Sequence, residues 1–220
     1  MGIKNGTTDW KQIKKLINQH KENNLEIGQE YMDEDGTIYQ VANIDTERHE
    51  VIFSRKCLLP ETNQMNFAHT NLWGYKDCRI RKYLNKEAIN QLSSELRAVI
   101  TPREFKVSEG FMCSELDTLT DLLFLPREGD VFAEQEQSFA AKSEYEEGGT
   151  RQWDLFKKTK ERIKTLGDEY GAVSNWWLAS PSIGNSSCFC FVTKNGVASN
   201  NLANCFYGIA PCFMIAAEKL

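Results

Sequence analysis

The charge distribution restricts the fold of this chain more than any other feature of its sequence. From residue 171 to the end, the charged residues are Lys194, Glu218 and Lys219, and every other charge of the 220-residue chain lies before this point. Asn, Ser, Gly, Cys and aromatic residues fill the C-terminal part instead. Turn signals such as Asn195-Gly196 separate short apolar stretches with the character of strands, at residues 176–179, 188–193 and 209–215. This part therefore predicts strands joined by turns.

The rest of the sequence adds helices and a hairpin. An amphipathic helix is predicted over Thr8–Asn24, with Thr8 or Asp9 as its cap. Alternating residues predict hairpin strands at 37–44 and 50–55. Further helices are expected up to Leu84 and over residues 86–92, 93–99 and 153–166, and a polar, exposed loop over 134–149. We therefore expect an α+β fold, with an N-terminal helical extension (residues 1–26) and one domain (residues 27–220).

Composition excludes several classes of protein. An apolar fraction of 41% supports a folded core, and a net charge of −5 without a basic run argues against nucleic-acid binding. No apolar run is long enough to span a bilayer, and the N-terminus lacks the apolar stretch of a signal peptide. We expect synthesis in the cytoplasm, and incorporation into a phage particle or display at a cell surface both stay open.

The seven cysteines form neither a disulfide framework nor a zinc site by their spacing. Their number is odd, they include no CxxC pair, and the three histidines are scattered. Reduced and mostly buried thiols are expected, and neither a cofactor nor a metal ion is predicted.

Candidate contact residues come from the charge-poor segment 184–208. Its small polar residues can supply adaptable hydrogen bonds and its aromatic residues rigid contact area, as in antibody paratopes. Most of the candidates are expected to be solvent-accessible and on one face: Ser187, Cys188, Phe191, Thr193, Val197, Ser199, Asn200, Asn201, Leu202, Asn204, Cys205, Phe206 and Tyr207.

Other aromatic residues are expected to form the scaffold. Trp176, Trp177, Phe213 and Ile215 are predicted to lie in the core beneath the candidate surface. Trp73 and Tyr83 are also predicted to be core residues. The pair Arg79 and Arg81 is interpreted as solvated or locally paired.

Three motifs resemble a bacterial and phage domain family with a C-type-lectin-like fold. Residues 176–181 read WWLASP and are similar to that family's WWLRSP-type strand. Residues 208–213 read GIAPCF and resemble its closing strand, and residues 73–84, ending in CRIRKYL, are similar to one of its helices. Ala179 and Ala210 stand where many members have Arg. The resemblance implies a twisted antiparallel sheet with short helices and long irregular segments.

A narrower resemblance concerns the segment 184–208. It is similar to the variable region of proteins diversified by retroelements, which mutate adenines in Asn-type codons. Such mutation can give Ser, Thr, Tyr, Cys, Phe, Leu, Val and others, but not Lys, Glu, Gln, Met or Trp, and between Ser187 and Tyr207 only Lys194 falls outside the permitted set. The resemblance implies a binding protein rather than an enzyme, with a protein or glycan on a cell surface as its ligand. The N-terminal helix would then mediate oligomerisation or attachment to a larger particle.

Three alternatives stay open at this point. The related fold of formylglycine-generating enzymes uses a copper-binding cysteine pair, for which Cys205 and Cys212 are candidates by position. A calcium-dependent lectin would need clustered carboxylates, but Glu218 is the single acid after residue 171. The segment could also belong to a purely structural phage or bacterial domain.

Overall fold

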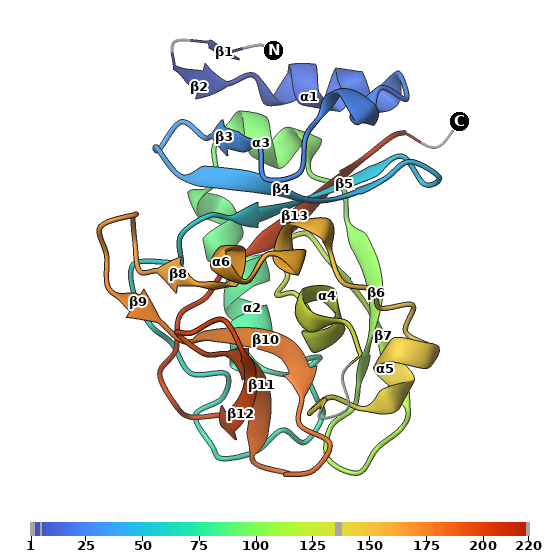
Figure 1. Cartoon of the computed structure of the whole chain (residues 1–220), viewed down its shortest axis with the longest axis vertical. Coiled ribbons are helices and arrows are strands. Elements are labelled where there is room, and N and C mark those ends of the chain that lie inside the picture. The colour runs from blue at the N-terminus through green and yellow to red at the C-terminus, as the bar shows by residue number, and fades with distance from the viewer. Residues whose placement is uncertain (1–2, 5, 135–137, 219–220) are drawn as a thin grey trace.

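The computed structural model describes residues 3–4, 6–134 and 138–218, and its mixed α+β architecture confirms the expected fold class. A four-stranded antiparallel sheet lies in the upper half of Figure 1, in the order β13-β5-β4-β3. Its strands are β3 (Glu30–Met32), β4 (Ile38–Asp45), β5 (Glu50–Arg55) and β13 (Cys212–Ala216). The first and last parts of the chain therefore meet in one sheet.

The β4–β5 hairpin forms where alternation predicted it. Val41 lies opposite Phe53 and Ile44 opposite Val51, with an irregularity between Val41 and Asn43. Apolar residues on both faces of these strands are buried, because helix α1 covers one face and the remainder of the chain covers the other. The predicted ranges 37–44 and 50–55 are confirmed to within one residue.

Helix α1 (Trp10–Asn18) is anchored to the sheet through its first residue. The Asp9 side chain caps it by accepting a hydrogen bond from the Gln12 N–H at 2.9 Å. The Trp10 ring contacts Phe53 and Phe213, with ring centroids 5.7 Å from each. The helix is shorter than predicted, because His20 adopts a left-handed backbone conformation (φ 57°) before the short 3₁₀ turn η1 (Glu22–Asn24). The division at residue 26 stays a prediction, although α1 shares the core of the rest of the chain.

Three short helical elements follow the hairpin: α2 (Arg79–Lys86), η2 (Ala88–Gln91) and α3 (Ser94–Val99). Ser93 caps α3, as predicted, by accepting a hydrogen bond from the Leu96 N–H at 3.1 Å. Arg81 of α2 forms an ion pair with the buried Asp121 at 2.8 Å, which confirms the local pairing expected for this arginine. Among the described residues, no helix is both long and apolar enough to cross a bilayer.

The middle of the chain forms the right side of the molecule in Figure 1. It contains the hairpin β6 (Arg103–Ser108) and β7 (Leu116–Asp121), followed by α4 (Glu128–Phe132) and α5 (Lys142–Glu146). Residues 135–137 of the predicted exposed loop over 134–149 lie outside the described residues. Over 138–149 the prediction is wrong, because α5 lies there and Glu144 is completely buried. Its carboxylate accepts hydrogen bonds from the Ser180 hydroxyl at 2.5 Å and the Ser108 N–H at 2.9 Å.

Burial raises the pKa of Glu144 to about 7, although its hydrogen bonds from Ser180 and Ser108 oppose the shift. Between pH 4.5, the ordinary value for a glutamate, and pH 7 the folded protein therefore holds a proton that the unfolded chain has lost. The free energy of unfolding should fall by up to about 3 kcal/mol as the pH rises through this window. Urea unfolding at several pH values should show this fall, and Glu144→Gln should remove most of it. Glu146→Gln, at an exposed position of the same helix, should leave it unchanged; an E144Q profile equal to that of the parent would contradict the assignment.

The predicted helix over 153–166 is wrong. The segment contains η3 (Asp154–Lys157), a single turn α6 (Thr159–Arg162) and the strand β8 (Lys164–Thr165), which pairs with β9 (Val173–Ser174). Tertiary hydrogen bonds outweigh the helical spacing of its apolar residues: the Lys164 ammonium donates to the Arg55 and Lys56 carbonyls at 2.6 and 2.9 Å. A short hairpin, β1 (Ile3–Lys4) and β2 (Thr7–Thr8), precedes α1.

The charge-poor part of the chain forms a second antiparallel sheet, in the order β10-β11-β12, at the lower left of Figure 1. Its strands are β10 (Trp176–Pro181), β11 (Cys188–Val192) and β12 (Ala198–Leu202), the last of which was not predicted. Trp176, Trp177, Phe213 and Ile215 are all fully buried, which confirms their predicted place in the core. The predicted core position of these four residues is therefore correct.

Candidate ligand-binding surface

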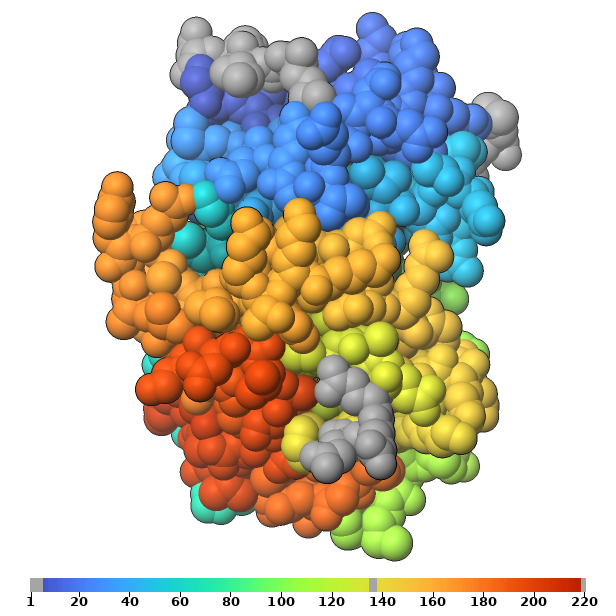
Figure 2. All heavy atoms as spheres, viewed as in Figure 1, coloured from blue at the N-terminus to red at the C-terminus, as the bar shows by residue number. Residues whose placement is uncertain are grey.

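The candidate residues lie on the hairpin β11–β12 and on the turn that follows it. Gly196, with φ 78°, provides the left-handed residue of the hairpin turn, and the Thr193 N–H donates to the Val197 carbonyl at 2.9 Å. Strand β12 is an edge strand of its sheet. In the space-filling view, the orange-to-red C-terminal part of the chain forms the lower left of the visible face (Figure 2).

The candidate residues differ in exposure. Val197 and Phe206 are exposed, at 54% and 62% of their full accessible surface. Two candidates are buried, Cys188 and Phe191, so the expectation that they contribute to an accessible surface is wrong. The others are half-buried: Ser187, Thr193, Ser199, Asn200, Asn201, Leu202, Asn204, Cys205 and Tyr207.

Phe191 is buried because β11 is the middle strand of its sheet. Its ring packs between Trp177 and Tyr207, with centroid distances of 6.1 and 4.6 Å, and the Trp177 and Tyr207 rings lie 4.7 Å apart. Ser199 lies opposite Phe191 in the register and Asn201 lies opposite Phe189. The aromatic triangle of Trp177, Phe191 and Tyr207 therefore supports this edge of the sheet from beneath.

Hydrogen bonds fix the turn after β12. The Asn201 amide donates to the Tyr207 hydroxyl at 2.6 Å, and the backbone of Tyr207 pairs with that of Asn63 at 2.8 and 3.1 Å. The Gln64 amide donates to the Asn204 carbonyl at 2.7 Å. Sequence reasoning did not identify Asn63 and Gln64, because no local pattern shows that residues 63–66 lie beside residues 203–207. The candidate surface is therefore held by a second segment, so it is a fixed platform rather than a free loop.

The predicted position of Trp73 is wrong. It was predicted to be a core residue, but 70% of its surface is exposed, whereas Tyr83 does pack against the core. Trp73 belongs to a loop that adjoins the start of the candidate segment, because the Asn71 N–H donates to the Ser186 carbonyl at 2.7 Å.

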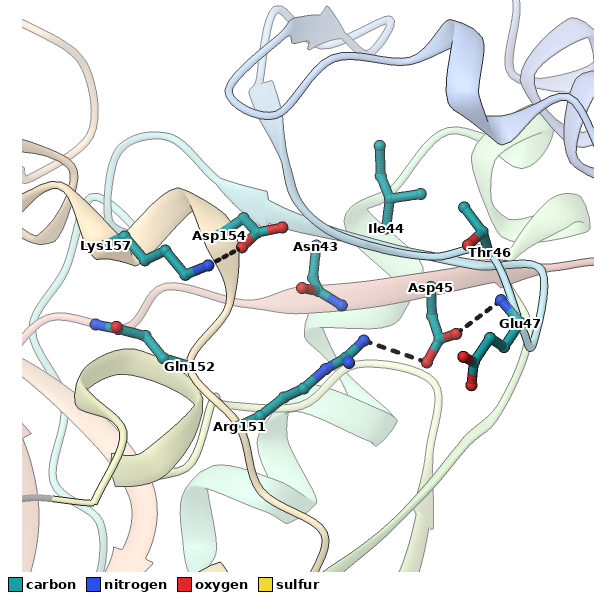
Figure 3. A pocket seen from close by; sticks show the side chains of 9 residues that line it. All are labelled: Asn43, Ile44, Asp45, Thr46, Glu47, Arg151, Gln152, Asp154 and Lys157. Carbon is teal, nitrogen blue, oxygen red and sulfur yellow. Dashed lines mark hydrogen bonds and ion pairs between the residues drawn. The ribbon is translucent and has the colours of Figure 1, made fainter.

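Several hollows of the described residues lie away from the candidate segment, and two of them adjoin each other. A groove of about 890 Å³ lies between the central sheet and β6, with Ile52, Met214, Arg103 and Trp153 among its lining residues. A smaller hollow of about 310 Å³ adjoins it and shares Asn43, Asp45 and Arg151. In Figure 3, Arg151 points toward Asp45 of β4, and the two form an ion pair at 3.4 Å.

These two hollows offer carboxylates and guanidinium groups for polar contacts. None of the candidate contact residues lines either of them, and their described linings contain no Ser, Cys or His side chain. Those side chains supply many enzymic nucleophiles and bases.

Two sets of side chains bear on metal binding. Glu109, Cys113 and Glu115 have potential ligand atoms within 4.8 Å of one another, on the turn between β6 and β7. Of the two cysteines compared with a copper-binding pair, Cys205 follows β12 in one sheet and Cys212 begins β13 in the other. Burial raises the pKa of the Cys212 thiol to about 12, which favours the protonated form over the thiolate that binds metals.

The chain belongs to a family defined by sequence. A family model described as a domain of unknown function (DUF6273) matches residues 47–217, which include the hairpin strand β5, the second sheet and β13. Comparison with curated proteins and comparison with solved structures gave no match. The family match covers every candidate contact residue but not α1, β3 or β4, although these elements complete the central sheet and its cover.

Proposed function

We propose that this protein binds a ligand, a protein or glycan on a cell surface, through the accessible side chains of residues 187–207. The fold assigned in this proposal is C-type-lectin-like, and the segment is a variable region of the retroelement-diversified kind that its sequence resembles. The observation that carries the proposal is the exposure of Val197 and Phe206 beyond the two ends of β12, a strand that pairs with the buried strand β11. A surface that tolerates substitution needs such a separation, because exposed side chains can change without loss of the core.

The structure narrows the proposed contact set. Cys188 and Phe191 are buried, so they support the surface and do not contact the ligand. Val197 and Phe206 are the candidates with the largest exposed fractions, and polar contacts come from half-buried residues such as Ser199, Asn200 and Asn204. Aromatic anchors surrounded by small polar groups are typical of binding surfaces.

A double variant, Val197→Ser with Phe206→Ser, tests the proposal. Its free energy of unfolding should change by no more than about 0.5 kcal/mol per site, since both side chains are exposed. Binding of the labelled protein to a panel of bacterial cells, measured by flow cytometry, should fall about 30-fold, which corresponds to ~2 kcal/mol for an aromatic contact residue.

The matched control is Val173→Ser with Tyr170→Ser, a pair of exposed residues outside the segment, and it should bind like the parent. Parental binding by the V197S/F206S variant would overturn the proposal. A near-copy of the codons for 184–208 beside a reverse transcriptase gene would support the retroelement origin independently.

A further inference from the structure

Two loops outside the proposed contact segment expose a group of large apolar side chains. Leu72, Trp73, Phe111 and Met112, together called the loop patch, are exposed at 59%, 70%, 38% and 78%. Figure 1 shows their loops, residues 70–76 and 108–114, at the lower end of the molecule beside the turn that joins β10 to β11. Because between 38% and 78% of the surface of each residue is accessible, a partner that covers them would gain the hydrophobic free energy of that part.

Close backbone contacts hold the two loops together. A Cβ atom at Gly74 would lie 2.4 Å from the Ser108 carbonyl oxygen, and one at Gly110 would lie 2.4 Å from the Asn71 carbonyl oxygen. The Phe111 N–H also donates to the Asn71 side chain at 3.3 Å. Glycine at both positions therefore allows a contact that a larger residue would prevent, and this contact holds the two loops that carry the four apolar residues side by side.

A buried asparagine ties both loops to the main body. Asn71 is fully buried, and its amide lies within hydrogen-bonding distance of the Ser182, Asn185 and Cys188 carbonyls at 2.9, 2.9 and 2.8 Å. The Met112 N–H donates to the Ile183 carbonyl at 3.3 Å. The loop patch is thus preorganised, which reduces the entropy lost when a partner binds.

The backbone conformation at the loop patch is unusual. Trp73 and Met112 have φ values of 67° and 55°, in the left-handed region that costs a non-glycine residue free energy. Both side chains point their large apolar surface into solvent, so neither repays this cost through core packing. Strained residues held by their surroundings are characteristic of binding sites.

The charges around the loop patch indicate what can cover it. Glu109 and Glu115 lie close together at the base of the loop 108–114. No ion pair in the described part of the chain engages either carboxylate, whereas the nearby Lys76 is paired with Asp117 at 2.7 Å. The free charge beside the apolar side chains is therefore negative.

We infer that the loop patch is a second interaction surface, for a protein partner that presents an apolar segment flanked by Lys or Arg. A basic group beside the segment would neutralise Glu109 and Glu115 while the apolar side chains cover Trp73 and Met112. A second copy of this chain would bring like charges together, and an anionic membrane surface would be repelled. This surface shares no side chain with the one proposed above.

The test is a selection of random peptides displayed on phage, with the whole protein immobilised. Enriched peptides should combine large apolar residues with Lys or Arg. Trp73→Asn with Met112→Asn should weaken their binding at least tenfold, and this variant should fold because asparagine accepts the left-handed conformation. Glu109→Gln with Glu115→Gln should weaken binding severalfold and reduce its dependence on salt.

The matched control is Tyr170→Asn with Val173→Asn, which removes exposed apolar surface outside both proposed surfaces and should keep parental affinity. Four results would overturn the inference: no enrichment, enriched peptides without basic residues, equal binding by the W73N/M112N variant, or equal binding by the E109Q/E115Q variant. Self-association in sedimentation velocity that W73N/M112N abolishes would identify a second copy as the occupant instead. Flotation of the protein with phosphatidylcholine vesicles would likewise replace the protein partner with a lipid surface.

Discussion

Replacing Trp177 with alanine should lower the free energy of unfolding by about 3–5 kcal/mol, the usual range for a fully buried large aromatic residue. The Trp177 side chain is completely buried and contacts both Phe191 and Tyr207. Its indole N–H also donates to the Asn63 carbonyl at 2.8 Å. Truncation therefore removes apolar contacts, leaves a cavity and takes a donor from a carbonyl that helps to position the turn after β12.

Trp73→Ala is the matched control, because it makes the same chemical change at an exposed position. Thermal or urea unfolding should place this variant within about 0.5 kcal/mol of the parent. Similar losses for W177A and W73A would contradict the assignment of Trp177 as the support of the candidate surface. Any binding lost by W177A should follow its loss of folded protein, whereas V197S/F206S should lose binding while it stays folded.

Local signals in the sequence predicted much of the fold. Alternating side chains marked β4 and β5, and the Asp9 and Ser93 caps marked the starts of α1 and α3. These features depend on residues a few positions apart, so they can be recognised from the sequence alone. The same reasoning failed over 153–166, where hydrogen bonds from Lys164 to the distant residues Arg55 and Lys56 favour a strand over a helix.

The sequence located the candidate surface along the chain, but it did not show which of its residues are exposed contact residues and which are buried supports. The scarcity of charge in 171–218 has two causes that look alike in sequence. In β11 charge is absent because the strand is buried on both faces, whereas around Phe206 it is absent from an exposed surface. Which strand lies in the middle of a sheet depends on long-range pairing, and β12 was missed because its Asn and Ser residues have low strand propensity.

Trp73 is the opposite case, a residue that was predicted to be buried and is exposed. Tryptophan is usually buried, so a prediction from residue type places it in the core. The contacts of Gly74 and Asn71 with distant loops turn it outward instead, and those contacts join residues that are far apart in sequence.

Replacing Asp130 with asparagine should destabilise the protein by about 3–5 kcal/mol at neutral pH, the usual cost of breaking a buried ion pair from one side. Asp130 is 1% exposed, and its carboxylate accepts hydrogen bonds from the Arg127 side chain at 3.0 and 3.1 Å. Arg103, whose side chain is 12% exposed, lies 3.7 Å away on the wall of the groove. The asparagine amide would leave two largely buried guanidinium groups without a negative charge.

The pH dependence of the loss distinguishes charge from packing. Burial alone would raise the pKa of Asp130, but Arg127 and Arg103 outweigh it and hold the pKa below its ordinary value of 3.8. The carboxylate therefore contributes stability above that ordinary value and loses the contribution as the pH falls through its lower folded pKa. The difference in unfolding free energy between parent and D130N should accordingly shrink in acid.

Arg103→Met in the D130N background should recover part of the loss of stability, because it removes one uncompensated charge. Asp154→Asn, which breaks an exposed ion pair with Lys157, should reduce the stability only a little. A loss that is the same at every pH, with no recovery on removal of Arg103, would show that Asp130 matters for its shape and not for its charge.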